Sequence, residues 1–202
     1  ATIIHDKIIS LKKQFHKKVI VVAEDSLTSG AYLVATAADK IYVNEDTVTG
    51  SIGVIMSSFG FTDAIDKIGI TRRVYTAGLN KDRLDPFLPE NPTDKAKIQS
   101  ILDTVHSNFI AVVKAGRKGK LHGSAAELFS GDFWLGKKAT ELGLVDGTMN
   151  LWDAAKKNFG TTHYIDYTRH RTLLENLFKK IGTVTKLTLH TETHSQLLAE
   201  QP

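Results

Sequence analysis

DSLTSGAY, residues 25–32, joins an apolar run to a segment of small, helix-forming residues. The run before it, residues 19–23, is short and rich in β-branched side chains, which predicts a buried strand. The segment after it, residues 31–38, is rich in alanine and predicts a helix. A serine at such a strand-to-helix turn is exposed beside the free N–H groups of the helix start, which is a place for a nucleophile. Helix capping by Thr28 or Ser29 is the alternative interpretation.

The composition is that of an ordinary globular protein. The chain has 202 residues, of which 42% are hydrophobic and 24% charged, enough for one domain with its own core or for one domain with a tail. No apolar run approaches the roughly 20 residues that a membrane helix needs. The absence of cysteine excludes disulfides, thiolate metal sites and a cysteine nucleophile.

The net charge of +4 is modest, and basic residues form two local clusters. Neither cluster is interleaved with aromatic side chains or lies in a nucleic-acid-binding motif, so we expect solvated helix faces and no nucleic-acid partner. The clusters are Lys12, Lys13, Lys17 and Lys18, and Lys114, Arg117, Lys118 and Lys120.

Strand and helix patterns alternate along the chain, which predicts an α/β domain over residues 1–166. The opening segment has apolar residues at helical spacing, namely Ile4, Ile8, Leu11 and Phe15. Strands are predicted at 40–44, 49–55 and 71–75, and helices at 63–68, 91–118, 125–129, 137–142 and 151–159. The polar loop 76–90 is long enough to be functional or mobile. The tail, residues 167–202, is predicted to be weakly ordered, with a short helix around 173–181.

A serine nucleophile needs a base to take its proton. None of the eight histidines lies in a glycine-marked loop with an acidic partner, so a Ser-His-Asp triad has no support in the sequence. A lysine can substitute, but only about one free lysine in 2,500 is neutral at pH 7, so burial or a nearby cation must favour the neutral form. Lys81, in the polar loop, is the candidate, although a lone loop lysine is ordinarily a solvated charge.

Four segments in order resemble the signal peptide peptidase SppA/SohB family of Ser-Lys peptidases. They are DSLTSGAY with the alanine-rich segment after it, TGSIGVI at 49–55, YTAGLNK at 75–81, and the stretch from Trp134 to GLVD at 143–146. Lys81 follows Ser29 by 52 positions, which matches the spacing of nucleophile and base in that family. The resemblance runs to about Asp166.

The resemblance implies a role for each matching residue. Ser29 falls on the nucleophile, Lys81 on the general base, and Ser51 on the serine that holds the lysine. The N–H of Gly30 falls on one oxyanion donor. We assign three neighbouring residues to substrate binding, namely Tyr32, Gly50 and Gly53. We expect no metal and no cofactor.

The resemblance also implies a fold and a biology. The fold is similar to that of Clp protease and crotonase, with repeated β-β-α units, and the family forms rings with small, apolar substrate pockets. It implies peptide substrates such as leftover signal peptides, and association with the bacterial cell membrane through a segment outside these residues. Ala1 follows the point where the family has Ser-Pro-Gly-Gly, which supplies the second oxyanion donor. We therefore expect an N-terminal strand to be missing. If these residues are the whole protein, we expect weak or no peptidase activity, and if they belong to a longer chain, we expect ordinary activity of that chain.

The sequence departs from the family pattern at three residues around Ser29. Ala31 replaces a glycine of the family pattern, and its methyl group is small enough to be tolerated. Leu27 and Thr28 replace smaller residues before Ser29, and we expect this change to reshape the substrate pocket.

Three functions stay open. The first is a peptidase, the second is a non-catalytic assembly or binding module of the same fold, and the third is a crotonase-like acyl-CoA enzyme. Lys81 buried beside Ser29 would favour the first, whereas an exposed Lys81 far from Ser29 would favour the second.

Overall fold

The computed structural model describes residues 1–168. Ala1–Thr162 form one compact unit, and the described residues 163–168 belong to a second unit. The division predicted between residues 166 and 167 stays a prediction, and the helix predicted around 173–181 lies outside the described residues.

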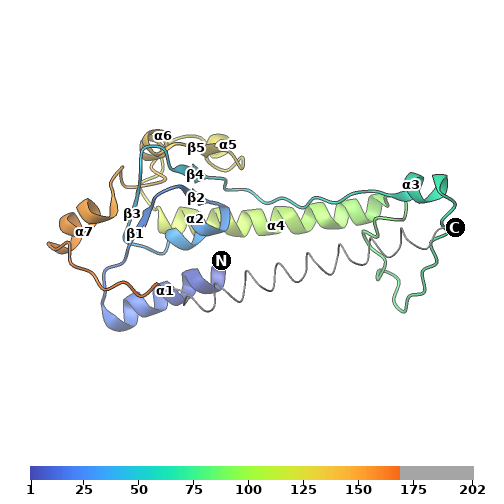
Figure 1. Cartoon of the computed structure of the whole chain (residues 1–202), viewed down its shortest axis with the longest axis horizontal. Coiled ribbons are helices and arrows are strands. Elements are labelled where there is room, and N and C mark those ends of the chain that lie inside the picture. Colours follow the sequence, from blue (N-terminus) through green and yellow to red (C-terminus); the bar gives the residue numbers. More distant parts are fainter. Residues whose placement is uncertain (169–202) are drawn as a thin grey trace, which may run out of the picture. The chain divides into compact units, whose positions relative to one another are not determined.

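Residues 1–162 form a series of helices and strands (Figure 1). In chain order they are α1 (Thr2–Phe15), β1 (Ile20–Ala23), β2 (Ser26–Thr28), α2 (Ser29–Ala35), β3 (Lys40–Val43), β4 (Val48–Gly50), α3 (Thr62–Lys67), α4 (Pro92–Gly116), α5 (Ala125–Leu128), β5 (Phe133–Trp134), α6 (Gly136–Glu141) and α7 (Leu151–Phe159).

Two β-β-α units stand side by side and pair strand for strand. The first unit is β1, β2 and α2; the second is β3, β4 and, after a long insertion, α4. β1 pairs in parallel with β3, with Ile20 opposite Lys40, and β2 pairs in parallel with β4, with Thr28 opposite Gly50. β5 adds an antiparallel strand to β4. The predicted α/β class and the repeated β-β-α units are confirmed.

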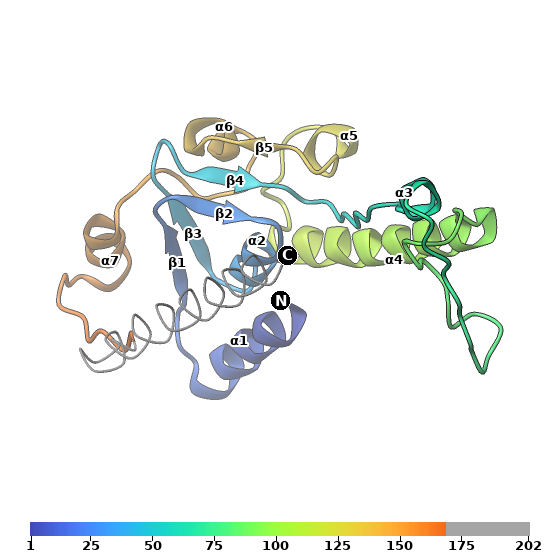
Figure 2. The ribbon, with the colours of Figure 1, turned by 45° about the vertical axis from the view of Figure 1, so that its right-hand side comes forward.

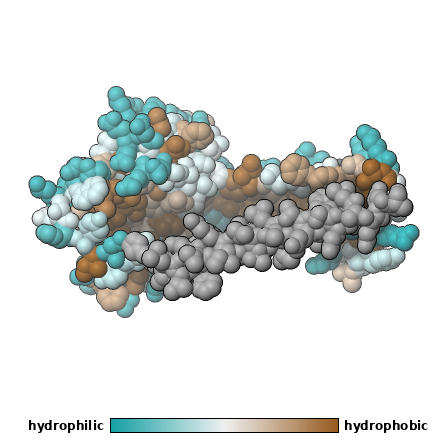
Figure 3. All heavy atoms as spheres, viewed as in Figure 1, coloured by the Kyte–Doolittle hydropathy of each residue, from teal (hydrophilic) through white to brown (hydrophobic). Residues whose placement is uncertain are grey.

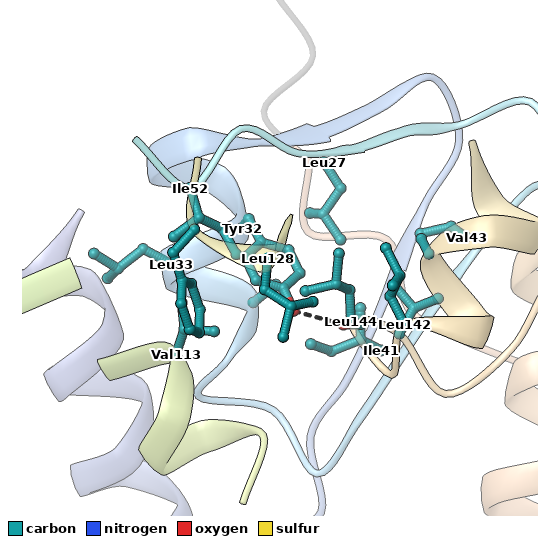
Figure 4. Close-up of a cluster of buried hydrophobic side chains, with 14 of the residues drawn as sticks. Leu27, Tyr32, Leu33, Ile41, Val43, Ile52, Val113, Leu128, Leu142 and Leu144 are labelled. Carbon is teal, nitrogen blue, oxygen red and sulfur yellow. Dashed lines mark hydrogen bonds between the residues drawn. The ribbon is translucent and has the colours of Figure 1, made fainter. Parts of the chain in front are cut away.

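The core lies between the strands, α2 and the C-terminal half of α4 (Figure 4). Apolar residues of both units meet there, because each helix turns one face toward the strands. They include Leu27, Leu33, Ile41, Val43, Ile52, Phe109, Val113 and Leu144, all nearly or fully buried. The core therefore fixes the ends of β2 and β4, which bear the candidate site.

A buried ion pair ties α4 to the segment GLVD, residues 143–146. Arg117 donates to the Gly143 carbonyl oxygen and lies 2.6 Å from the Asp146 carboxylate, and only 2% and 7% of the two side chains are exposed. Lys120 and Lys40 also pair with Asp146. The prediction that Arg117 belongs to a solvated basic face is wrong, because Arg117 faces the core.

Three of the four residues in the apolar stripe predicted for α1 are exposed, contrary to the usual outcome of such a pattern. α1 contacts α2, and the half-buried residues of α1 are His5, Ile8, Ile9 and Lys12. Ile4, Leu11 and Phe15 are 57%, 38% and 55% exposed. The opening helix is thus confirmed, but the side that packs is rotated from the predicted stripe.

Residues 54–91, called the arm below, extend from β4 along α4 to its N-terminal end (Figures 1 and 2). The arm contains α3, which confirms the helix predicted at 63–68. Residues 71–75 form no strand, and β4 ends at Gly50, so the strands predicted at 71–75 and through Ile55 are wrong. Apolar side chains lie on the surface of the arm (Figure 3), among them Ile55, Phe59, Ile68, Ile70, Tyr75 and Leu79.

Candidate functional site

Ser29 sits at the sharp turn between β2 and α2. β2 ends at Thr28, and Ser29 is the first residue of α2. Ser29 has φ 51°, in the left-handed region that residues other than glycine rarely adopt. Thr28 occupies the N-cap position, but its side chain makes no capping hydrogen bond. A simple capping role therefore does not account for this turn, whose backbone strain is typical of functional sites.

Ser51 sits at a second tight turn, directly after β4. Gly50 has φ 115° and Ser51 has φ 52°. The Ser51 N–H donates to the Asp132 carbonyl oxygen at 2.7 Å, and the Gly53 N–H donates to the Ser51 carbonyl oxygen at 3.0 Å. The turn is thus held by its own backbone and by the segment before β5.

Both serines line one cleft of about 1320 Å³. Its polar lining comes from Ser29, Ser51, His106, Asn108 and Ser130, and backbone approaches it at Gly30, Gly53 and Gly131. Its apolar lining comes from Leu33, Val54, Ile55, Val105, Phe109 and Val112. A cleft with an apolar wall and a few convergent polar groups is the usual form of a small-ligand or peptide site.

Ala1 and Thr2 also line this cleft, and a Cβ on Gly30 would lie 3.4 Å from the Ala1 Cβ. The start of α1 is therefore next to the turn that bears Ser29. Gly53 lies against Gly131, where a Cβ on Gly53 would lie 2.8 Å from the Gly131 Cα. The backbone segments at Gly53 and Gly131 are therefore close together.

Lys81 is exposed on the arm and does not line the cleft that contains Ser29. Its N–H donates to the Gly78 carbonyl oxygen, in a loop near the N-terminal end of α4 (Figures 1 and 2). The structure therefore brings together Ser29, Gly30, Ser51 and Gly53, and leaves Lys81 apart from them in a single chain.

Tyr32 and Gly50 have structural positions that differ from the predicted substrate-binding role. Tyr32 is fully buried, and its hydroxyl donates to the Leu144 carbonyl oxygen at 2.7 Å (Figure 4). Burial raises the pKa of this hydroxyl well above its ordinary value. Gly50 lies against Trp134, where a Cβ would approach the indole ring to 2.9 Å. Tyr32 is a core residue, and Gly50 permits the packing of β5.

His106 also lines the cleft, although no motif in the sequence predicts it there. It lies on α4, half-buried, with Nε2 3.0 Å from the Ile52 carbonyl oxygen. One sequence feature could have indicated that His106 faces inward: it lies on the predicted helix, one turn before the apolar residues Phe109 and Ile110 that face the core.

Residues 1–168 contain no cluster of histidine and acidic side chains that could hold a metal ion. In the same part of the chain, no helix combines the length and the apolarity that crossing a bilayer requires.

The chain is similar to a known peptidase family and to several known proteins. A family model described as peptidase family S49 matches residues 11–161. A protein named Na(+)/H(+) antiporter NhaA, from Brucella melitensis, is 44% identical over 158 residues, which cover 78% of this chain and 21% of that protein. A putative signal peptide peptidase SppA from Enterococcus faecium is 33% identical over 123 residues, which cover 61% of this chain and 36% of that protein.

Both relatives are much longer than the region they share with this chain, which spans about a fifth of one and about a third of the other. Among solved structures, an enoyl-CoA hydratase from Shewanella pealeana matches 77% of this chain and 42% of its own. That match has a TM-score of 0.37 and 15% identity.

Proposed function

Because the chain belongs to peptidase family S49, we propose that it forms the nucleophile-bearing part of a serine peptidase that works through a Ser29–Lys81 dyad. The observation that supports this most is the meeting of Ser29 and Ser51 in one apolar cleft, each at a strained turn. Strain of this kind persists only where the surrounding structure enforces it, and it is common at active sites.

In the proposed reaction, Ser29 Oγ attacks the carbonyl carbon of a peptide bond, and the neutral amine of Lys81 takes the hydroxyl proton. The N–H of Gly30, the residue after the nucleophile, stabilises the oxyanion that forms. The intermediate then expels the amine product, which receives the proton from Lys81, and leaves an acyl ester on Ser29. Water attacks this ester with Lys81 as base and releases the acid product. Ser51 Oγ accepts a hydrogen bond from the amine and directs it toward Ser29.

Lys81 must reach the cleft for this chemistry, and we propose that assembly of several copies brings it there. The arm that bears Lys81 exposes many apolar side chains, including Phe59 at 79%, Tyr75 at 91% and Leu79 at 98%. Exposed apolar surface on this scale is typical of an interaction surface. Lys81 from a neighbouring copy would lie against the apolar wall of the cleft and lose its contact with water. Because water stabilises the charged amine, this loss would favour the neutral form.

The expected substrates are peptides with small or apolar side chains, such as residual signal peptides. Leu33, Val54, Val105 and Phe109 give the cleft a wall suited to such side chains. A relative that is similar to this chain has the name of a signal peptide peptidase. Substrates of this kind are produced at a membrane, and we propose that the protein associates with one through a segment outside residues 1–168.

Ser29 labelling by a fluorophosphonate probe tests the proposal. The probe phosphonylates an activated serine and loses fluoride, so wild-type protein is expected to be labelled and Ser29→Ala is not. Lys81→Ala is expected to be labelled much more slowly, and an exposed lysine on the same arm, Lys67→Ala, serves as the control. Equal labelling of wild type and Lys81→Ala would rule out the dyad.

A mixture of Ser29→Ala and Lys81→Ala copies tests whether Lys81 acts between copies. The first variant supplies an intact Lys81 and the second an intact Ser29, so about a quarter of the contacts in a randomly mixed ring would be complete. Recovery of cleavage of an apolar peptide on mixing is expected. No recovery, with an active wild type, would place Lys81 and Ser29 of the same copy together.

The exposed position of Lys81 favours one other candidate function. If the arm serves only to join copies or to bind a partner, the protein is a non-catalytic module of the same fold. That alternative predicts no probe labelling of Ser29 in the wild type at any protein concentration.

A further inference from the structure

His106 contacts the candidate site from outside the two turns that form it. Its ring lines the cleft with Ser29 and Ser51, and its Nε2 lies 3.0 Å from the Ile52 carbonyl oxygen. A carbonyl oxygen can only accept a hydrogen bond, so Nε2 bears the proton and donates it. Through this bond, α4 is tied to the residue that directly follows Ser51.

The turn that holds Ser51 is therefore fixed from three directions. The segment before β5 receives the Ser51 N–H at the Asp132 carbonyl oxygen. The Ile52 side chain is fully buried in the core. His106 holds the Ile52 carbonyl oxygen from α4. Ser51 has φ 52°, so its backbone would relax toward a more common conformation if one of these restraints were lost.

We propose that His106 is a positioning residue of the peptidase, which holds the Ile52 carbonyl oxygen so that Ser51 Oγ stays directed at the catalytic amine. This inference rests on the proposed function, because it is the dyad that needs Ser51 in place. His106 acts through the backbone of the turn and does not touch the reacting atoms.

The cleft is open to solvent. Loss of the His106 hydrogen bond therefore has different consequences for stability and for catalysis. If the imidazole is removed, water can reach the Ile52 carbonyl oxygen, so the fold loses little. The direction of Ser51 Oγ is lost all the same, since a bound water does not fix the turn as a side chain anchored on α4 does. The effect of the change is therefore expected in catalysis more than in stability.

Two substitutions with opposite hydrogen-bonding ability test the proposal. His106→Leu removes the donor, whereas His106→Gln retains an amide N–H that can reach the same carbonyl oxygen. His106→Leu is expected to lower kcat on an apolar peptide, and the rate of Ser29 phosphonylation, by about 10-fold to 100-fold. KM is expected to change much less, and His106→Gln is expected to restore most of the rate. His122→Leu replaces an exposed histidine outside the cleft and serves as the control.

The proposal is overturned if His106→Leu matches the wild type in both rates, or if His106→Gln is as slow as His106→Leu. An unlabelled wild type would instead contradict the proposed peptidase function. In that case hydrogen exchange of the Ser51 and Gly53 amides still tests the positioning of the turn. Faster exchange in His106→Leu than in the wild type and His106→Gln supports the role, and equal exchange in all three overturns it.

Discussion

Ser29 and Ser51 occupy equivalent places in two paired β-β-α units, and their φ angles are nearly the same, 51° and 52°. The residues just before them, Thr28 and Gly50, are opposite one another in the parallel pair of β2 and β4. Parallel pairing carries both strands to the same edge, where their carboxyl ends meet. The repeat thus places two strained serine turns side by side, so the residues proposed as nucleophile and as its helper, Ser29 and Ser51, have equivalent positions in successive units.

The strained backbone of Ser29 predicts a difference between two substitutions that both remove the hydroxyl. Ser29→Gly relieves the left-handed conformation, whereas Ser29→Ala retains a Cβ in it. We expect Ser29→Gly to be more stable than Ser29→Ala by about 1 kcal/mol in urea unfolding, with probe labelling absent from both. If Ser29→Ala equals or exceeds Ser29→Gly in free energy of unfolding, the strain at this turn is not real.

Gly53 predicts a steric effect on the cleft. A Cβ at Gly53 would lie 2.8 Å from the Gly131 Cα, which is backbone and cannot swing aside. We expect Gly53→Ala to cost about 1–3 kcal/mol of stability and to abolish labelling of Ser29, because the Ser51 turn must move. Gly60 on the arm has no atom within 4 Å of a Cβ, so Gly60→Ala is the matched control. Similar free energies of unfolding for the two variants would contradict the close contact.

Local signals in the sequence predicted most helices well. α4 begins at Pro92 with Asn91 as its cap, and the Asn91 side chain accepts from the Thr93 N–H, as the Asn-Pro pair indicates. α7 spans Leu151–Phe159, the predicted range, and ends at Gly160 in the left-handed conformation. Caps and helical periodicity are properties of neighbouring residues, so they can be read without knowing the fold.

The errors concern contacts between distant segments. Periodicity marked an apolar face on α1 but could not say which partner it meets, and Ile4, Leu11 and Phe15 are exposed. The sequence placed Arg117 in a basic cluster, but in the folded chain Arg117 forms an ion pair with Asp146. At the candidate site, the resemblance predicted the order of Ser29, Ser51 and Lys81 along the chain. The distances between them in space depend on the position of the arm, which spacing along the sequence does not define.

Tyr32→Phe tests the core position of Tyr32 against the substrate-binding role that the sequence suggested. The change removes the hydrogen bond to the Leu144 carbonyl oxygen and leaves that buried acceptor without it. We expect a loss of about 1–3 kcal/mol in the free energy of unfolding, with KM for an apolar peptide unchanged. A raised KM with unaltered stability would return Tyr32 to the substrate site.

Asp146 predicts how stability depends on pH in acid. Burial alone would raise the pKa of its carboxyl group, but hydrogen bonds from Lys120, Arg117 and the Ile41 N–H outweigh burial and hold the pKa well below its ordinary range. The unfolded chain, with an ordinary carboxyl pKa of about 3.9, therefore takes up a proton at higher pH than the folded chain does. The stabilisation from Asp146 is complete above that value and is lost as the pH falls toward the lower pKa of the folded state.

Asp146→Asn isolates this contribution. The amide cannot ionise, so the variant leaves the buried Arg117 guanidinium without a charged partner, at an expected cost of about 3–5 kcal/mol at pH 7. Its free energy of unfolding is also expected to fall less steeply than that of the wild type as the pH decreases below about 5. Lys138→Gln, which breaks the exposed pairs with Glu127 and Glu141, is expected to cost less than about 1 kcal/mol. Parallel pH profiles for Asp146→Asn and the wild type would show that Asp146 has an ordinary carboxyl pKa in the folded protein.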